Sequence, residues 1–205
     1  RDEIFGESFR ALQQKEVGVL KNRLQIEFTA SDGRPEAGID GGGLFKEFMD
    51  SFVKEAFDPK FGLFNPTSSN LLVPNPISEA LFEEWTLQYY QFVGKMLGKA
   101  MYDCILVEAQ FSVIFLNVLL GKLNQFDDLV FLDELTYRSL KQIKQMAAAG
   151  ENLEDLDLYF VMQRTDIEGS VVSTDLLPGG SQIRVNRSNV HKYLHHFAYH
   201  KLNVE

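Results

Sequence analysis

The sequence predicts an α+β fold that is predominantly helical, and three observations support this class. Apolar residues recur three and four positions apart over most of the chain, which is the period of a helix with one buried face. Strict alternation of apolar and polar residues is confined to short stretches bounded by turn residues. The 205 residues are 45% apolar, which is enough for one globular domain or two small subdomains.

In the first half of the chain, each expected element depends on a local pattern. Leu24, Ile26 and Phe28 alternate with polar neighbours, as in a half-buried strand. After the glycine-rich segment 38–43, apolar residues follow at helical spacing as far as Ala56. We therefore expect, in order, a helix over 2–19, a strand over 24–28, a helix after residue 43, and two short strands at 62–64 and 71–73.

The second half begins with a predicted long helix over 78–106, in which Gly94 and Gly98 leave room for another backbone to approach closely. A later helix has its N-cap at Asp133 and ends near Gly150. The other expected elements are a buried helix over 111–120, a strand over 156–162, a hairpin turn at 165–169, a second strand from residue 171, a turn at 178–180, a short strand at 183–185, and a final helix capped by Asn186.

Charge and cysteine content exclude several classes of protein. Twenty basic and 29 acidic residues give a net charge of −9, so we expect neither nucleic acid nor a membrane surface as a partner. The longest apolar stretch, 111–120, is too short to span a bilayer. One cysteine excludes a disulfide framework and any multi-cysteine metal site. No secretory signal is visible, and we expect an intracellular protein of the cytoplasm or nucleus.

The glycine-rich segment 38–43 invites a phosphate-binding interpretation, which its spacing does not support. No Lys-Ser or Lys-Thr pair follows Gly43, and the third glycine of a Gly-x-Gly-x-x-Gly motif is replaced by Lys46. We interpret these glycines as backbone positions that need positive φ or close packing before a helix.

Cysteine and histidine offer no self-contained active site either. Cys104 has an acidic neighbour, Asp103, instead of the basic group that activates a thiol, so we expect a small buried apolar side chain. The four histidines fall in one predicted helix, as pairs spaced i,i+4 that could chelate a metal. They are His191 with His195 and His196 with His200. The pairs lie on different faces, and we expect surface or partner-facing histidines instead of a metal site.

Three blocks of sequence match one known family in order and spacing. They are Glu36-Ala-Gly-Ile-Asp-Gly-Gly-Gly-Leu-Phe-Lys-Glu-Phe48, Leu71-Leu-Val-Pro-Asn-Pro76, and Phe92-Val-Gly-Lys-Met-Leu-Gly-Lys-Ala-Met-Tyr-Asp103. Pro178-Gly-Gly180 and Tyr193 fit as well. On these residues the chain resembles, over essentially its whole length, the HECT-type ubiquitin-protein ligase domain.

This resemblance implies the N-terminal lobe of such a domain over 1–205, with a large helical subdomain and a small helix-and-hairpin subdomain at 111–178. In this family the N-terminal lobe recruits a ubiquitin-conjugating enzyme, and a cysteine in a C-terminal lobe accepts ubiquitin as a thioester. Cys104 does not match that cysteine. The resemblance therefore implies no catalytic residue and no cofactor in this chain, and protein substrates recruited by regions outside it.

The resemblance also implies a docking groove for the conjugating enzyme, formed by a helix and the hairpin after it. The family's groove residues match Thr136, Ser139, Leu140, Met146, Leu156 and Leu158. Thr136 stands where a relative has leucine. From the alternating pattern alone, Leu156 and Leu158 are expected in the core of the hairpin.

Some family members hold a second, noncovalent ubiquitin on this lobe. The resemblance places Phe61 at one position of that ubiquitin-binding surface. At the other position relatives have phenylalanine, whereas this chain has Glu168 beside Gly169. A carboxylate there removes the apolar contact.

Two alternatives to a ligase lobe stay open. One is a non-catalytic interaction scaffold that has lost recruitment of the conjugating enzyme. The other is a metal-dependent protein that uses the histidine-rich helix. Binding to conjugating enzymes distinguishes the first alternative from a ligase lobe, and metal analysis tests the second.

Overall fold

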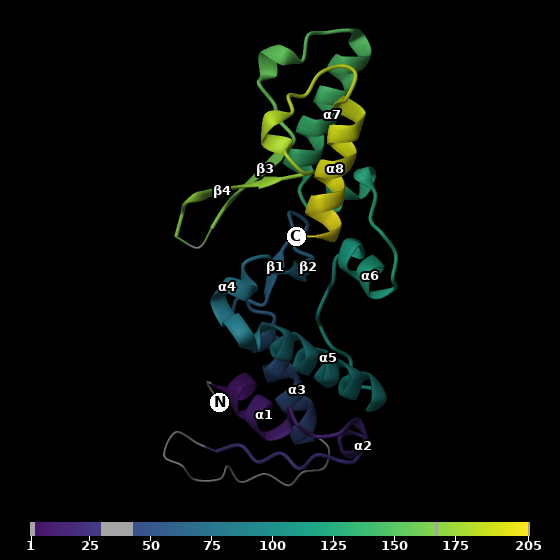
Figure 1. Cartoon of the computed structure of the whole chain (residues 1–205). Helices are drawn as coiled ribbons and strands as arrows, with labels where there is room; N and C mark the ends of the chain where they lie inside the picture. Colours follow the sequence, from purple (N-terminus) through teal and green to yellow (C-terminus); the bar gives the residue numbers. More distant parts are fainter. Residues whose placement is uncertain (1–2, 30–42, 167, 205) are drawn as a thin grey trace. The chain divides into compact units, whose positions relative to one another are not determined.

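The chain divides into two compact units, each of which uses two separate stretches of sequence (Figure 1). The computed structural model describes residues 3–29, 43–166 and 168–204. The first unit comprises Arg1–Asn65 and Ser78–Gln110, and the second comprises Pro66–Ile77 and Phe111–Glu205. In the described part of the chain, helices dominate and the strands form two two-stranded sheets, so the predicted α+β, mainly helical class is confirmed.

The first unit is a group of helices around an aromatic core. Its elements are α1 (Ile4–Leu12), α2 (Val17–Leu20), α3 (Gly43–Ala56), β1 (Phe64–Pro66), α4 (Ser78–Phe82), the 3-10 helix η1 (Glu83–Trp85) and α5 (Thr86–Tyr102). The next strand along the chain, β2 (Leu72–Pro74), belongs to the second unit. The ring of Phe5 lies 5.5 Å from that of Phe52 and 5.8 Å from that of Phe92, so one aromatic cluster joins α1, α3 and α5.

Two lysines of α5 hold the N-terminal segment against this helix. Lys95 Nζ donates to the carbonyl of Gln13, the C-cap of α1, at 2.6 Å. Lys99, only 4% exposed, donates to the carbonyl of Asn22 at 2.9 Å and pairs with Asp103 at 2.8 Å. Its buried ammonium therefore has both a hydrogen-bond acceptor and a counter-charge, as a buried charge requires.

Three predictions for the first unit need correction. The helix expected over 2–19 is two helices, α1 and α2. The strand expected over 24–28 is absent from the named strands, although Leu24, Ile26 and Phe28 are less exposed than the polar residues between them. The helix expected over 78–106 is interrupted at Glu83, where φ is +50°, and α5 ends at Tyr102.

The described residues confirm neither of the two glycine predictions. Gly38 to Gly42 lie outside the described residues, and Gly43 begins α3. Near Gly94 and Gly98 no atom lies within 4 Å of the place that a Cβ would occupy, apart from the helix's own backbone, within the described part of the chain. The close approach of another backbone, expected there from the sequence, is not seen.

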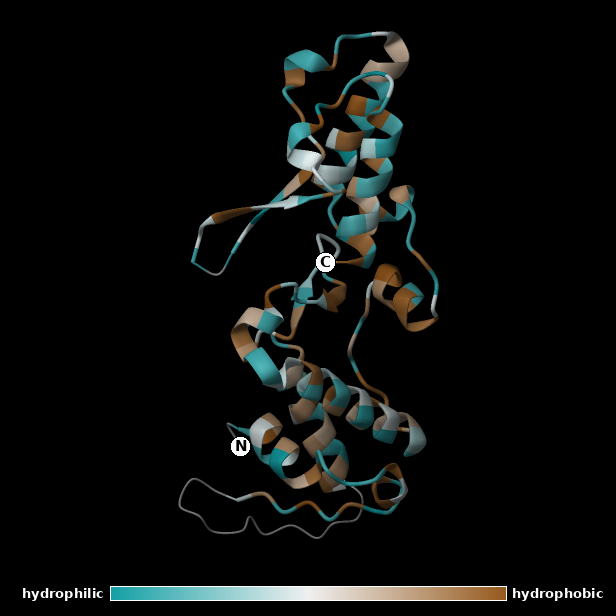
Figure 2. Ribbon diagram, viewed as in Figure 1, coloured by the Kyte–Doolittle hydropathy of each residue, from teal (hydrophilic) through white to brown (hydrophobic). Residues whose placement is uncertain are grey.

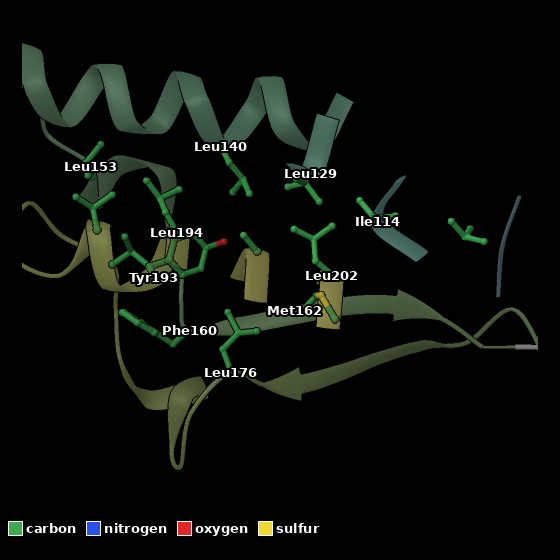
Figure 3. Packing of buried hydrophobic residues seen from close by; sticks show 14 residues of the cluster. Ile114, Leu129, Leu140, Leu153, Phe160, Met162, Leu176, Tyr193, Leu194 and Leu202 are labelled. Atoms are coloured by element: carbon green, nitrogen blue, oxygen red, sulfur yellow. The ribbon is translucent and has the colours of Figure 1, made fainter. Parts of the chain in front are cut away.

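The second unit packs helices against a hairpin. Besides β2, its elements are α6 (Val113–Leu119), the 3-10 helix η2 (Phe126–Phe131), α7 (Glu134–Ala149), the 3-10 helix η3 (Glu154–Leu156), β3 (Val161–Thr165), β4 (Val171–Asp175), the 3-10 helix η4 (Gly180–Gln182) and α8 (Val190–Asn203). Figure 3 shows α7 on one side of the buried cluster and the hairpin on the other. The core includes Leu140, Phe160, Met162 and Leu194. The unit continues through α8 beyond residue 178.

The hairpin confirms the predicted turn but not the predicted start of its first strand. β3 and β4 are antiparallel, with Met162 opposite Thr174. In the turn, Asp166 Oδ1 accepts the N–H groups of Glu168 at 3.0 Å and Ser170 at 2.8 Å. β3 begins at Val161 instead of 156, because a 3-10 turn precedes it.

The other differences in this unit concern helix exposure and helix ends. α6 is largely exposed, with only Ile114 buried, although a buried helix was expected; Figure 2 shows its mostly hydrophobic residues. The strand expected at 183–185 is reduced to an isolated bridge between Tyr159 and Arg184. The last helix begins at Val190, one turn after Asn186.

The N-terminus of α7 confirms the predicted cap at Asp133. Its carboxylate accepts the N–H of Thr136 at 2.9 Å and the hydroxyl of Thr136 at 2.7 Å. Burial by itself raises the pKa of this carboxyl, but the hydrogen bonds from Thr136 and the charge of Lys201 together lower it below the ordinary value of 3.8. At the other end, Gly150 adopts φ +86°, the left-handed cap expected there.

Removing the cap with Asp133→Ala is expected to lower the free energy of unfolding by about 1 kcal/mol at neutral pH. Because the pKa is lower in the folded state, the ionised cap stabilises the fold above pH 3.8 and loses this effect as the pH falls through the folded-state pKa. Asp133→Asn, which keeps an acceptor, is the control. Urea denaturation at pH 7 and pH 3 checks this, and equal losses for both variants would contradict a capping role.

Candidate functional site

Helix α7 carries four of the predicted docking residues, and they do not share one face. Leu140 is 4% exposed and belongs to the core of the second unit, where Figure 3 shows it pointing away from α7 into the cluster. Ile143 and Ala147, three and seven positions later, pack against the same core. The expectation that Leu140 lines an exposed groove is therefore wrong for this structure, and the spacing with Ile143 and Ala147 was the signal that could have placed it.

The polar atoms of Thr136 take part in the cap of α7. Its hydroxyl donates to Asp133 Oδ2, and its side chain is half-buried. Where a relative has leucine, this chain therefore has a residue whose polar atom already serves the start of α7. A threonine tied in this way offers less apolar surface to a partner than leucine does.

Ser139 and Met146 lie on a different side of α7. Successive residues of a helix are rotated by 100° about its axis, so Ser139 and Met146 lie about 100–120° around α7 from Leu140. Ser139 is exposed, and its hydroxyl donates to the carbonyl of Leu135 at 3.0 Å. Met146 is half-buried against the core. Leu135, which the sequence analysis missed, has the same orientation and is 77% exposed. We call Leu135, Ser139 and Met146 the α7 flank.

In the segment after α7, Leu156 and Leu158 do not have the arrangement that two residues of one strand would have. Leu156 ends η3 and is 38% exposed, while Asp157 adopts φ +48°. Leu158 is half-buried against the core, and its carbonyl accepts the N–H of Val185 at 2.7 Å. Because the left-handed Asp157 lies between them, the two leucines do not alternate as strand neighbours. Leu156 offers surface to a partner, whereas Leu158 packs inward as the hairpin-core interpretation expected.

A shallow cavity of about 300 Å³ lies on the other side of α7 from the flank. Its walls include Tyr137, Lys141 and Lys144 from α7 and Phe126 from η2. The two ammonium groups lie over aromatic rings, each 5.5 Å from the ring centre. This cavity contains none of the predicted docking residues.

The two residues expected at a ubiquitin-binding surface have different environments. Phe61 is half-buried in the aromatic core of the first unit, with its ring 4.5 Å from that of Phe5 and 5.7 Å from that of Phe82. Glu168 is exposed in the hairpin turn beside Gly169, which has φ +82°. Part of the Phe61 ring is therefore already used for packing.

The single thiol is exposed, and the expectation of a buried Cys104 is wrong. The residue lies two positions after the end of α5, in a left-handed backbone conformation with φ +55°. All four histidines lie on α8, as predicted. Burial, His195 and Lys192 lower the pKa of His196, and burial raises the pKa of Tyr193.

Two kinds of feature are not found within the described ranges. No group of three or more histidine, cysteine, aspartate or glutamate side chains there is placed to hold a metal ion. None of the helices described is both long enough and apolar enough to cross a membrane.

Comparison with known proteins identifies the family. Residues 50–205 match the model of the HECT-domain (ubiquitin-transferase) family. The whole chain is 37% identical to the E3 ubiquitin-protein ligase UPL6 of Arabidopsis thaliana and 35% identical to the ubiquitin-protein ligase E3B of Homo sapiens. Nearly all of it, 99%, aligns with the E3 ubiquitin-protein ligase HUL5 of Saccharomyces cerevisiae at 34% identity. The chain spans only 19%, 19% and 22% of these three relatives. It belongs to the HECT family of ubiquitin transferases.

Proposed function

We propose that this chain is the N-terminal lobe of a HECT-type ubiquitin-protein ligase and docks a ubiquitin-conjugating enzyme. Ubiquitin then passes as a thioester to a cysteine of a C-terminal lobe that lies outside residues 1–205. Substrates are recruited by further regions of the ligase. The observation that carries this proposal is the family match over residues 50–205, together with relatives named as ubiquitin ligases that align along the whole chain.

The proposed transfer requires no reactive side chain in this lobe. Passing a thioester from one cysteine to another needs the two sulfurs to be brought together, and such proximity supplies a large part of the rate. A docking lobe can provide that proximity without an activated nucleophile, a metal or a cofactor.

The α7 flank and Leu156 are the part of the proposed docking region that a partner can reach. Leu135 is 77% exposed and Ser139 is exposed, whereas Leu140 and Thr136 are used by the core and by the helix cap. We place the main docking contacts on Leu135, Ser139, Met146 and Leu156. Leu140, Leu158 and Thr136 support these residues from beneath.

This placement is tested by titrating a panel of conjugating enzymes into the chain by calorimetry. Leu135→Asp and Ser139→Arg are each expected to weaken binding by about 30-fold, because losing a central interface residue costs about 2 kcal/mol. Both variants should melt like the parent, since both positions are exposed.

Leu119→Asp is the matched control, because Leu119 is 65% exposed on α6 in the same unit. It should leave the affinity unchanged. A loss in the control equal to that of Leu135→Asp would mean that added negative charge, and not the position on the α7 flank, weakens the complex. Unchanged affinity in both flank variants would mean that the conjugating enzyme does not bind at this face of α7.

A non-catalytic scaffold is the second candidate. The observation that favours it is the loss of two family contacts, since Thr136 is tied to Asp133 and Leu140 is in the core. If no conjugating enzyme of the panel binds at concentrations up to about 1 mM, the scaffold is the better description.

The chain alone is expected to form no thioester with ubiquitin. Cys104 does not match the family's catalytic position, and no basic residue stands beside it in the sequence. Incubation with activating enzyme, conjugating enzyme, ubiquitin and ATP should give no adduct that a reducing agent removes. A reductant-sensitive adduct that disappears in Cys104→Ser would contradict this expectation.

A further inference from the structure

Helix α8 carries two histidine pairs at the i,i+4 spacing, and the structure distinguishes them. His191 and His195 are both exposed. His196 and His200 are partly buried, and Nδ1 of His200 is buried with no hydrogen-bond partner among the described residues. Only the first pair therefore presents two freely accessible imidazoles, one helical turn apart, on the same side of a 14-residue helix.

We propose that His191 and His195 form a two-histidine clamp for a divalent transition-metal ion such as Ni²⁺, Cu²⁺ or Zn²⁺. Side chains at i and i+4 of a helix have Cβ atoms about 5–6 Å apart. Two imidazole nitrogens can therefore meet one ion at the usual distance of about 2.0–2.1 Å. Water fills the other positions, and imidazole is a ligand that suits these metals.

The groups around the clamp include two aromatic side chains and one cation. The centre of the His195 ring lies 5.7 Å from that of the His196 ring and 6.3 Å from that of the Tyr199 ring. Helical side chains lean toward the N-terminus, so His195 can leave Tyr199 and reach back to His191. Lys192 repels a metal dication, while the net charge of −9 over the whole chain attracts it.

Metal binding at this place is expected to stabilise the second unit. α8 also supplies Tyr193, Leu194, Ala198 and Leu202 to the core, so its helical conformation and the packing of the unit are coupled. A clamp spanning one turn binds the ion with two ligands only while α8 is helical. Binding to the folded state alone raises the melting temperature in proportion to the logarithm of the metal concentration.

The test is a titration of the whole chain with Ni²⁺ by calorimetry at pH 7.5, in a Cys104→Ser background that removes the exposed thiol as a ligand. We expect one ion per chain and an increase in melting temperature with Ni²⁺. His191→Ala and His195→Ala should each weaken binding by about ten-fold or more, because a chelate loses its second, intramolecular contact. Both variants should lose the metal-dependent increase in melting temperature.

His196→Ala is the matched control, since it removes a neighbouring histidine of the other pair. It should change the affinity for Ni²⁺ by no more than about two-fold. A ten-fold loss in this control would overturn the assignment to His191 and His195. Unchanged affinity in His191→Ala, or no detectable binding to the parent, would overturn the proposal itself.

Discussion

Replacing Leu140 by aspartate is expected to unfold the second unit, and not merely to weaken a docking contact. The side chain is 4% exposed and lies in the core between α7 and α8. Truncating such a leucine to alanine costs about 2–5 kcal/mol, and a buried carboxylate without a partner costs more. The total stability of a domain is about 5–15 kcal/mol. Urea denaturation followed by circular dichroism should therefore show loss of the cooperative transition.

Leu135→Asp on the same helix is the control for this result. Leu135 is exposed, so the carboxylate stays hydrated and the free energy of unfolding should change by about 0.5 kcal/mol or less. If Leu140→Asp instead melts like the parent, Leu140 faces solvent, and the exposed groove that the family resemblance implies is restored.

Gly180→Ala is expected to be the most damaging single-methyl change in the second unit. A Cβ at Gly180 would lie 2.2 Å from the carbonyl oxygen of Phe160, a distance that real Cβ atoms do not reach. That oxygen also accepts the N–H of Leu176 at 2.8 Å, so it cannot move without breaking a bond at the base of the hairpin. We expect a loss of about 3 kcal/mol or more, measured by thermal denaturation.

The neighbouring Gly179 provides a control with a different physical origin. It adopts φ +73°, but nothing lies within 4 Å of its Cβ position among the described atoms. Gly179→Ala should therefore cost only the strain of a left-handed backbone, about 1 kcal/mol. If the two variants were equally stable, the close contact at Gly180 would not be what demands glycine there.

The class of the fold and the ends of α7 could be predicted because they depend on local chemistry. Asp133 caps the helix through its own carboxylate, and Gly150 takes a conformation that glycine adopts without strain. Both signals lie within one turn of the helix end that they define. Helical periodicity likewise depends on neighbours three and four residues away.

The interruptions that the sequence did not show depend on turns of the backbone that the spacing of apolar residues does not record. The hydroxyl of Thr86 donates to the carbonyls of Ser78, at 3.2 Å, and Glu83, at 2.9 Å, and this holds the interruption between α4 and α5. Apolar spacing runs through that interruption without change. Asp157, with φ +48°, likewise ends the alternation before β3, although no glycine marks the position.

The candidate site could be predicted as a set of positions but not as a surface. The family resemblance transfers the identity of a position, and accessibility depends on how this chain packs around it. Leu135 and Leu140 are both leucines on α7, yet one is exposed and the other buried. The spacing of Leu140 with Ile143 distinguishes them, so helical periodicity is the better guide to exposure in this helix.

The division of the chain has a consequence for its synthesis on the ribosome. All residues of the first unit have been translated once Gln110 is added, whereas Pro66–Ile77 belongs to the second unit, whose remaining residues begin at Phe111. Translating the residues from Phe111 to Glu205 takes roughly 5–20 seconds at usual rates.

During that interval the nascent chain carries β2 without the residues that later cover it. Val73 is buried in the finished core, and the carbonyl of Leu72 accepts the N–H of Ser112 at 2.9 Å. Until Ser112 is made, this strand has an open edge of the kind that chaperones shield and that pairs wrongly with other chains. The edge of β2 is therefore covered soon after Gln110 is added, whereas Val73 stays uncovered until the rest of the second unit has been made.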